Sequence, residues 1–137
     1  MRCHADAMKG LRVLVVEESP GVASLLTDIY SGQGAEVTVA GTPFEAMSLL
    51  LTGRFDLVTL EIMPSGPYRM RVLEFIRNCR RNLVPKTLVI TAYRYDRQVL
   101  TVLNSMQVSY VFKPFKMEDV CNRSRQLLTC PSPTAAA

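Results

Sequence analysis

Five short apolar segments recur along the chain, each four to six residues long and rich in Val, Leu, Ile and Thr. They cover residues 11–16, 36–40, 56–60, 86–91 and 109–112. Segments of this length and composition predict β-strands. Because their apolar residues follow one another and do not alternate with polar ones, we expect strands buried on both faces. A parallel sheet covered by helices has strands of this kind.

The stretches between these strands have apolar residues at helical spacing. Val22, Leu25, Leu26 and Ile29 recur every three or four positions, and similar patterns follow the next three strands. A last helix is expected over residues 117–128. Strands and helices therefore alternate, which predicts an α/β protein of the (βα)5 sandwich type.

Capping residues, glycines and prolines indicate where the helices begin and end. Thr42 and Pro43 open the second helix, with Glu45 three positions after the threonine as in a capping box. Glycines within 31–34 and 52–53 end the first two helices. Pro85 excludes a helix that continues into the fourth strand.

The length of 137 residues fits one domain. We expect an N-terminal tail over 1–10, the domain over 11–128 and a disordered tail over 129–137, where the sequence is of low complexity. The N-terminus lacks the apolar core of a secretory signal, and no apolar run is long enough to cross a membrane. We therefore expect a soluble, cytoplasmic protein without membrane contact.

The net charge of +4 conceals an asymmetry. Residues 1–66 contain 4 Lys and Arg against 8 Asp and Glu, whereas residues 67–137 contain 12 against 4. The basic residues follow no DNA-binding motif, so we expect no nucleic-acid partner. The four cysteines form no CxxC pair, and the pattern does not favour a zinc site.

Polar residues that could bind a ligand or take part in a reaction lie at the ends of four of the predicted strands. Glu17 and Glu18 follow the first, Glu61 the third, Thr91 ends the fourth and Lys113 follows the fifth. In a doubly wound sheet these positions share the edge at which ligands bind. Clustered carboxylates repel one another, so either Lys113 or a divalent metal must neutralise part of the charge.

In this order and spacing, four motifs resemble a response-regulator receiver domain, the CheY-like phosphoacceptor module, from about Leu11 to Leu128. They are "VLVVEES", "FDLVTLEIMP", "VITAY" and "YVFKPF". The resemblance implies a flavodoxin-like three-layer sandwich with a parallel sheet in strand order 2-1-3-4-5. It also implies a role in two-component signal transduction without enzymatic activity of its own.

In that family, an aspartate after the third strand accepts a phosphoryl group from a histidine kinase with the help of Mg²⁺. Thr91, Ala92, Tyr110 and Lys113 match the residues that bind the phosphoryl oxygens and transmit the signal. Glu61 stands at the phosphoacceptor position. The resemblance gives the metal positions as Glu17, Glu18, Glu61 and Met63, and it implies a cis peptide bond between Lys113 and Pro114.

The glutamates depart from the family pattern, in which the phosphoacceptor is aspartate. Pro64 also comes one position early, and Arg69 replaces the usual glycine. One extra methylene moves the carboxylate oxygen by about 1.3 Å, and Mg²⁺ requires near-octahedral ligands at roughly 2.0–2.1 Å. We therefore expect weak Mg²⁺ binding or none, and a Glu61 carboxylate that reaches Lys113 directly and imitates the phosphorylated state or remains inert.

These departures leave three functional hypotheses. The first is an atypical pseudo-receiver that binds proteins independently of phosphorylation. The second is a weak but functional Mg²⁺-dependent phosphoacceptor in a phosphorelay, and the third is a ligand-binding module. An FMN site would need a loop rich in Ser, Thr and Gly after the first strand, and a dinucleotide site would need GxGxxG; neither is present.

A sensor kinase or a downstream effector is the expected partner. The resemblance places the contact on the face of the fourth helix, fifth strand and fifth helix. Its charged residues are Arg94, Arg97, Lys116, Glu118, Asp119, Arg123 and Arg125. A solvated face of mixed charge is the alternative interpretation of the same residues.

Overall fold

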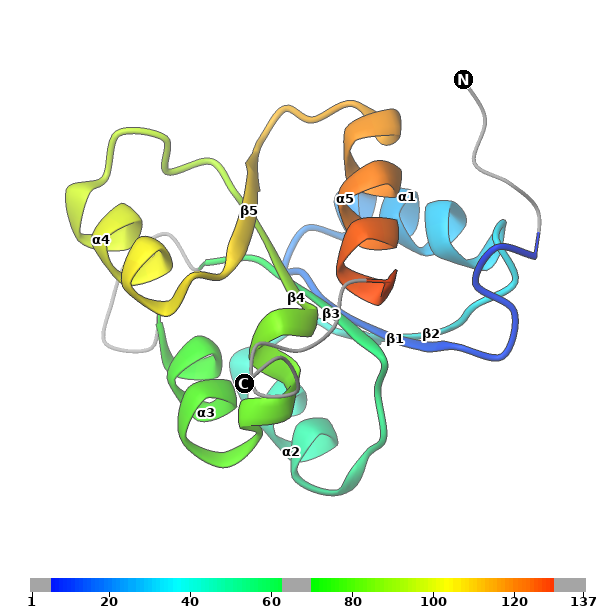
Figure 1. Cartoon of the computed structure of the whole chain (residues 1–137), viewed down its shortest axis with the longest axis horizontal. Coiled ribbons are helices and arrows are strands. Elements are labelled where there is room, and N and C mark those ends of the chain that lie inside the picture. Colours follow the sequence, from blue (N-terminus) through cyan, green and yellow to red (C-terminus); the bar gives the residue numbers. More distant parts are fainter. Residues whose placement is uncertain (1–5, 63–69, 130–137) are drawn as a thin grey trace.

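The computed structural model describes residues 6–62 and 70–129. Its sheet consists of β1 (Arg12–Val16), β2 (Glu36–Ala40), β3 (Leu57–Leu60), β4 (Thr87–Thr91) and β5 (Ser109–Phe112). All pairs are parallel and the order is β2-β1-β3-β4-β5. Both the predicted fold class and the predicted strand order are confirmed (Figure 1).

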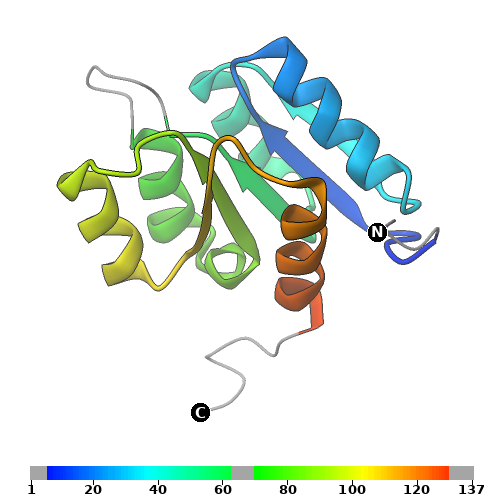
Figure 2. The same ribbon diagram turned by 90° about the horizontal axis from the view of Figure 1, so that it is seen from above.

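Helices cover both faces of this sheet (Figures 1 and 2). They are α1 (Pro20–Ser31), α2 (Pro43–Thr52), α3 (Arg71–Cys79), α4 (Arg97–Met106) and α5 (Met117–Thr129). One apolar core joins the sheet to α2, α3 and α4 and includes Leu14, Val58 and Leu73. The other joins it to α1 and α5 and includes Val15 and Leu26. The molecule is therefore a three-layer sandwich.

Burial differs between the central and the edge strands. β3 and β4 are buried at every position and β1 at four of its five, as the run of apolar residues predicts. The prediction of burial on both faces is wrong for β2 and β5, which remain largely half-exposed. An edge strand has a neighbour on only one side, so helices that cover the sheet faces leave its outer side accessible.

Short polar side chains begin three of the helices. Thr42 accepts a hydrogen bond from the Glu45 amide at 3.2 Å, which confirms the predicted cap of α2. Ser19 and Asp96 cap α1 and α4 in the same way. The predicted ends of α1 and α2 are also confirmed, since α1 ends at Ser31 and α2 at Thr52.

Two features were not predicted from the sequence. A 3₁₀ helix, η1 (Arg81–Lys86), contains Pro85 and leads directly into β4. Met8 lies in the segment that was expected to be a tail, yet it is fully buried and its amide donates to the Gln33 carbonyl at 2.8 Å. A short turn that packs against α1 has no periodic pattern of apolar residues from which its burial could be predicted.

Buried polar contacts join α1 to α5. The hydroxyls of Tyr30 and Ser124 lie 2.7 Å apart, and both side chains are fully buried. Burial raises the pKa of the Tyr30 hydroxyl, so it stays protonated and available as a donor. Such a pair fixes one helix against the other, because separating the two hydroxyls would leave buried polar atoms unpaired.

Within the described residues, no helix combines the length and the apolar character that a membrane crossing requires.

Candidate functional site

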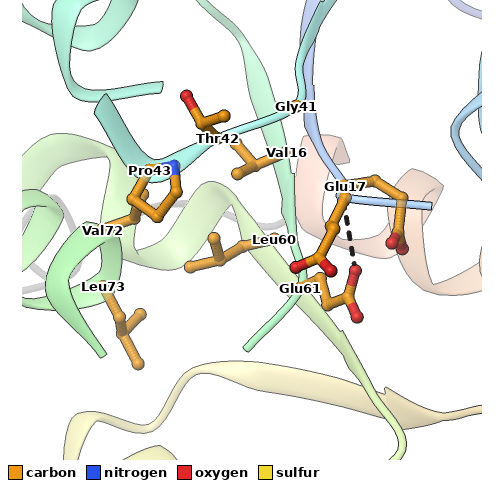
Figure 3. A pocket seen from close by; sticks show the side chains of 10 residues that line it. Val16, Glu17, Gly41, Thr42, Pro43, Leu60, Glu61, Val72 and Leu73 are labelled. Carbon is orange, nitrogen blue, oxygen red and sulfur yellow. Dashed lines mark hydrogen bonds between the residues drawn. The ribbon is translucent and has the colours of Figure 1, made fainter. Parts of the chain in front are cut away.

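Three loops at the carboxyl edge of the sheet bring charged residues together. Glu17 follows β1, Glu61 follows β3 and Lys113 follows β5. Each is positioned by a backbone hydrogen bond from its amide to the neighbouring strand: Glu17 to Ala40 at 3.0 Å, Glu61 to Val16 at 3.0 Å and Lys113 to Thr91 at 2.9 Å. The sheet register therefore determines where these side chains begin. Figure 3 shows the side chains of Glu17 and Glu61 next to each other.

Lys113 joins the two carboxylates. Its Nζ lies 2.8 Å from Glu17 Oε1 and 3.3 Å from Glu61 Oε1. Glu17 Oε1 is buried, and no donor has the geometry of a hydrogen bond to it. Its contact with Lys113 is therefore an ion pair. The predicted ion pair between Lys113 and Glu61 is confirmed, and the Lys113–Pro114 peptide bond is cis as predicted.

The second oxygen of each carboxylate accepts a backbone hydrogen bond. Glu17 Oε2 accepts from the Ser19 amide at 3.0 Å. Glu61 Oε2 accepts from the Glu18 amide at 3.3 Å, the contact that is dashed in Figure 3. Glu18 therefore contributes its backbone to the cluster, while its side chain is exposed. The sequence predicts three acids at this edge, and Lys113 forms ion pairs with two of them, Glu17 and Glu61.

The surroundings disfavour the charged form of Glu61. The pKa of Glu61 is raised from 4.5 to about 7, first by burial and then by hydrogen bonding to the adjacent Glu17 carboxylate and by its charge. Lys113 opposes both effects and lowers it. Protonated Glu61 can donate to Glu17, whose Oε1 has no other donor in line. The cluster thus holds a titrating proton near neutral pH.

This arrangement does not fit a Mg²⁺ ion. All four oxygens of Glu17 and Glu61 are engaged by Lys113 or by backbone amides. A cation bound there would have to displace the ammonium and break these contacts, whereas Mg²⁺ requires free oxygen ligands in near-octahedral geometry. Among residues 6–62 and 70–129, no group of three or more Asp, Glu, His or Cys is arranged to hold a metal. Met63 lies outside the described residues.

A very small cavity adjoins the cluster. Its volume is about 10 Å³, and it is lined by Glu17, Glu61, Thr42 and apolar side chains of β1, β3 and α3 (Figure 3). A space of this size holds about one water molecule. It cannot admit a nucleotide or a similar organic ligand.

The hydroxyls of the predicted switch residues Thr91 and Tyr110 do not contact each other, although the Lys113 amide donates to the Thr91 carbonyl at 2.9 Å. Thr91 is fully buried at the end of β4, and its Oγ1 accepts from the Tyr93 amide at 3.1 Å. Tyr110 on β5 donates its hydroxyl to Asn104 Oδ1 at 3.3 Å, on α4. The structure therefore gives each hydroxyl a different partner. Ala92 is exposed.

Two residues that hydrogen-bond to side chains at this edge of the sheet were not predicted from the sequence. Ser19 caps α1 and binds Glu17 through its amide. Its place directly before Pro20 was an available signal, because a serine followed by proline is a common helix start. Asn104 holds Tyr110 from the middle of α4, and no pattern marked it in advance.

The sequence model of the response regulator receiver domain matches residues 13–125. Among curated proteins, the DNA-binding response regulator MtrA of Mycolicibacterium smegmatis is 32% identical over 117 residues, which make up 85% of this chain and 50% of MtrA. The chain therefore spans about half the length of the curated relatives it matches.

Solved structures agree with this match. The response regulator TrrA of Thermotoga maritima in complex with Mg²⁺-BeF superposes with a TM-score of 0.73 at 28% identity, covering 86% of this chain and 99% of TrrA. The complex of the histidine kinase ThkA with TrrA gives a TM-score of 0.71 at 28% identity, covering 87% of this chain and 99% of the matched one.

Proposed function

Because the chain belongs to the response regulator receiver domain family, we propose that it acts as a pseudo-receiver, a module that binds a protein partner independently of phosphorylation. Receiver domains are in general not enzymes, and the proposal assigns this chain no catalytic step. Its cytoplasmic location stays a prediction. The absence of a nucleic-acid partner also stays a prediction, since the match to the DNA-binding regulator MtrA covers 50% of that protein.

One observation carries the proposal: Lys113 lies between Glu17 and Glu61, 2.8 and 3.3 Å from their oxygens. Phosphoryl transfer depends on an accessible, aligned nucleophile and on cations that neutralise the transferred group. Here the available cation already pairs with the nucleophile's own carboxylate. The charge that phosphorylation would bring is thus supplied by the side chain of Glu61 itself.

The longer side chain supports imitation of the phosphorylated state. A glutamate places its carboxylate about 1.3 Å further from the backbone than an aspartate would, on the side where a phosphoryl group would stand. Its ion pair with Lys113 holds the loop after β5 against the loop after β3. In this proposal Lys113 pairs with Glu17, and with Glu61 whenever that carboxylate is charged, so the arrangement depends on pH and not on the concentration of phosphodonor.

A weak phosphoacceptor is the second candidate. A largely apolar depression of about 470 Å³ lies beside the cluster, lined by Val22, Leu25, Phe115 and Lys113 among others. Leu25 is 40% exposed there. A phosphodonor protein would bind at this depression, which includes Lys113. A complex of a histidine kinase with a response regulator is among the solved structures similar to this chain. Binding of an organic ligand between Glu17 and Glu61 receives no support, because the cavity there holds about one water.

Intact-mass measurement after incubation with acetyl phosphate and Mg²⁺ distinguishes the first two candidates. We expect the protein to keep its mass, because Glu61 is paired with Lys113 and the oxygens of Glu17 and Glu61 are already engaged by Lys113 or by backbone amides. The Glu61→Asp variant is the matched comparison, since it restores the family's nucleophile and changes nothing else. A stable phosphoryl adduct on Glu61 of the unaltered protein would refute the pseudo-receiver proposal and favour the phosphorelay.

A further inference from the structure

Exposed apolar side chains form a stripe along α2. Phe44, Met47 and Leu51 follow one another at spacings of three and four positions, so they share one side of the helix. Phe44 is 62% and Leu51 is 68% exposed, whereas Met47 is partly buried against the core. Single exposed apolar residues are ordinary on protein surfaces, but a contiguous group of them marks an interaction site. We call these three residues the α2 stripe.

A groove between α2 and α3 continues the α2 stripe. The two helices lie side by side (Figure 1), and the groove between them has a volume of about 520 Å³. Met47 belongs to both the stripe and the groove, so the two form one continuous surface. The wall from α3 consists of Arg71, Glu74, Phe75, Asn78 and Cys79.

Hydrogen bonds hold the two helices in a fixed arrangement. Arg80, directly after α3, donates through Nη1 to the carbonyls of Leu50 and Gly53 at the end of α2. These carbonyls have no partner within their own helix, because the last turn of a helix leaves its carbonyls free. The cap at Thr42 orders the other end of α2. A surface that is ordered in this way loses little conformational freedom on binding.

The charge of the groove is balanced. Within the described residues, its lining has one cation, Arg71, and one acid, Glu74, three positions apart on the exposed side of α3. A strongly acidic or strongly basic partner would meet one like charge for every opposite one. The groove therefore selects against partners of high net charge.

A second copy of the chain fits this balance. In a two-fold symmetric dimer each copy presents the same patch, so every contact occurs twice. Arg71 of one copy then faces Glu74 of the partner subunit, and the reverse pair forms at the same time. The apolar α2 stripe is likewise matched by an apolar surface on the other copy.

We propose that the α2 stripe and the adjoining groove form the interface of a homodimer. Phe44 and Leu51 of each copy become buried against the other, and Arg71 and Glu74 pair across the two-fold axis. None of the described lining residues comes from α4, β5 or α5, so this surface is separate from the one predicted for a sensor kinase or an effector. The inference goes beyond the proposed function and involves no chemistry at Glu61.

The test is sedimentation equilibrium over a range of protein concentrations. We expect a monomer–dimer equilibrium with a Kd below roughly 1 mM. Leu51→Glu places a charge in the apolar centre and should raise this Kd at least tenfold, while circular dichroism shows an unchanged fold because the side chain is exposed. Tyr95→Glu is the control, since Tyr95 is 90% exposed outside this surface, and it should leave the Kd unchanged.

Charge exchange tests the pairing across the axis. Arg71→Glu and Glu74→Arg each bring like charges together in the dimer, and each should raise the Kd by roughly tenfold. The double variant restores opposite charges at both places and should return the Kd close to that of the unaltered protein. A double variant that dimerises no better than the single ones would refute the pairing.

A chain that stays monomeric at 1 mM would overturn the proposal, and so would a dimer that Leu51→Glu leaves intact or that Tyr95→Glu disrupts. A monomeric chain whose amide signals in α2 and α3 shift on addition of a neutral amphipathic helical peptide would instead assign the surface to a different protein. The samples contain neither Mg²⁺ nor a phosphodonor. The acetyl phosphate experiment therefore remains a separate test of the proposed function.

Discussion

At the scale of single residues, Lys113 decides the electrostatics of the cluster. It is the cation that lies within 4 Å of both Glu17 and Glu61. The two carboxylates come from different loops, and Glu17 is almost fully buried. Without the lysine, a buried carboxylate would remain beside a second acid, an arrangement that costs more than the ion pair itself contributes.

We therefore predict that Lys113→Met lowers the free energy of unfolding by roughly 1–3 kcal/mol at pH 8. Urea denaturation followed by circular dichroism measures the change. The double variant Lys113→Met with Glu61→Gln should recover part of the loss, because it removes one of the unpaired carboxylates. Lys116→Met is the control, and a loss of equal size there would contradict the role given to the Lys113 ion pairs.

A second prediction concerns pH. The pKa of Glu61 is raised from 4.5 to about 7 by burial and by Glu17. The folded state thus holds this proton more tightly than the unfolded chain. The resulting stabilisation is complete below pH 4.5 and is lost as the pH rises through about 7. Glu61→Gln keeps a neutral side chain at every pH.

The stability of Glu61→Gln relative to the unaltered protein should accordingly increase between pH 5 and pH 8. Urea denaturation of both proteins at several pH values provides the difference in the free energy of unfolding. If the unaltered protein instead gained stability relative to the variant over this range, the charged form of Glu61 would be the favoured one, and the Lys113 ion pair would outweigh burial.

At the scale of elements, most boundaries could be predicted because they depend on local signals. β2 and β5 have the predicted bounds, and the predicted cap at Thr42 is present. The exposure of β2 and β5 could not be deduced from their own residues, because it depends on which strands lie at the edges. The cluster was partly predictable for the same reason: the sheet edge follows from topology, whereas the outward direction of Glu18 depends on the turn before α1.

The capping box of α2 allows a test at this scale. Thr42 Oγ1 accepts from the Glu45 amide at 3.2 Å and lies 3.4 Å from Glu45 Oε1. Thr42→Ala removes both contacts, and we expect it to lower the free energy of unfolding by about 1 kcal/mol. Thr101→Ala, at an exposed position inside α4, is the control. Equal effects in thermal denaturation of the two variants would show that the cap contributes nothing specific.

At the scale of the whole molecule, acidic and basic residues are concentrated in different parts of the sequence. The acidic part, residues 1–66, supplies both carboxylates of the cluster, whereas the basic part, residues 67–137, supplies Lys113. The parallel sheet brings the two parts together at its carboxyl edge, where the lysine neutralises the acids.

The burial of Met8 has a consequence for any polypeptide joined to this domain. The side chain fills part of the core beneath α1, and its amide completes the hydrogen bonding of Gln33 at the end of that helix. A fusion that replaced everything before Leu11 would leave a void where the methionine packs, with the carbonyl of Gln33 deprived of its donor. Linkers for reporter or tethering experiments are therefore best attached upstream of the turn that contains Met8, where they leave the packing against α1 intact.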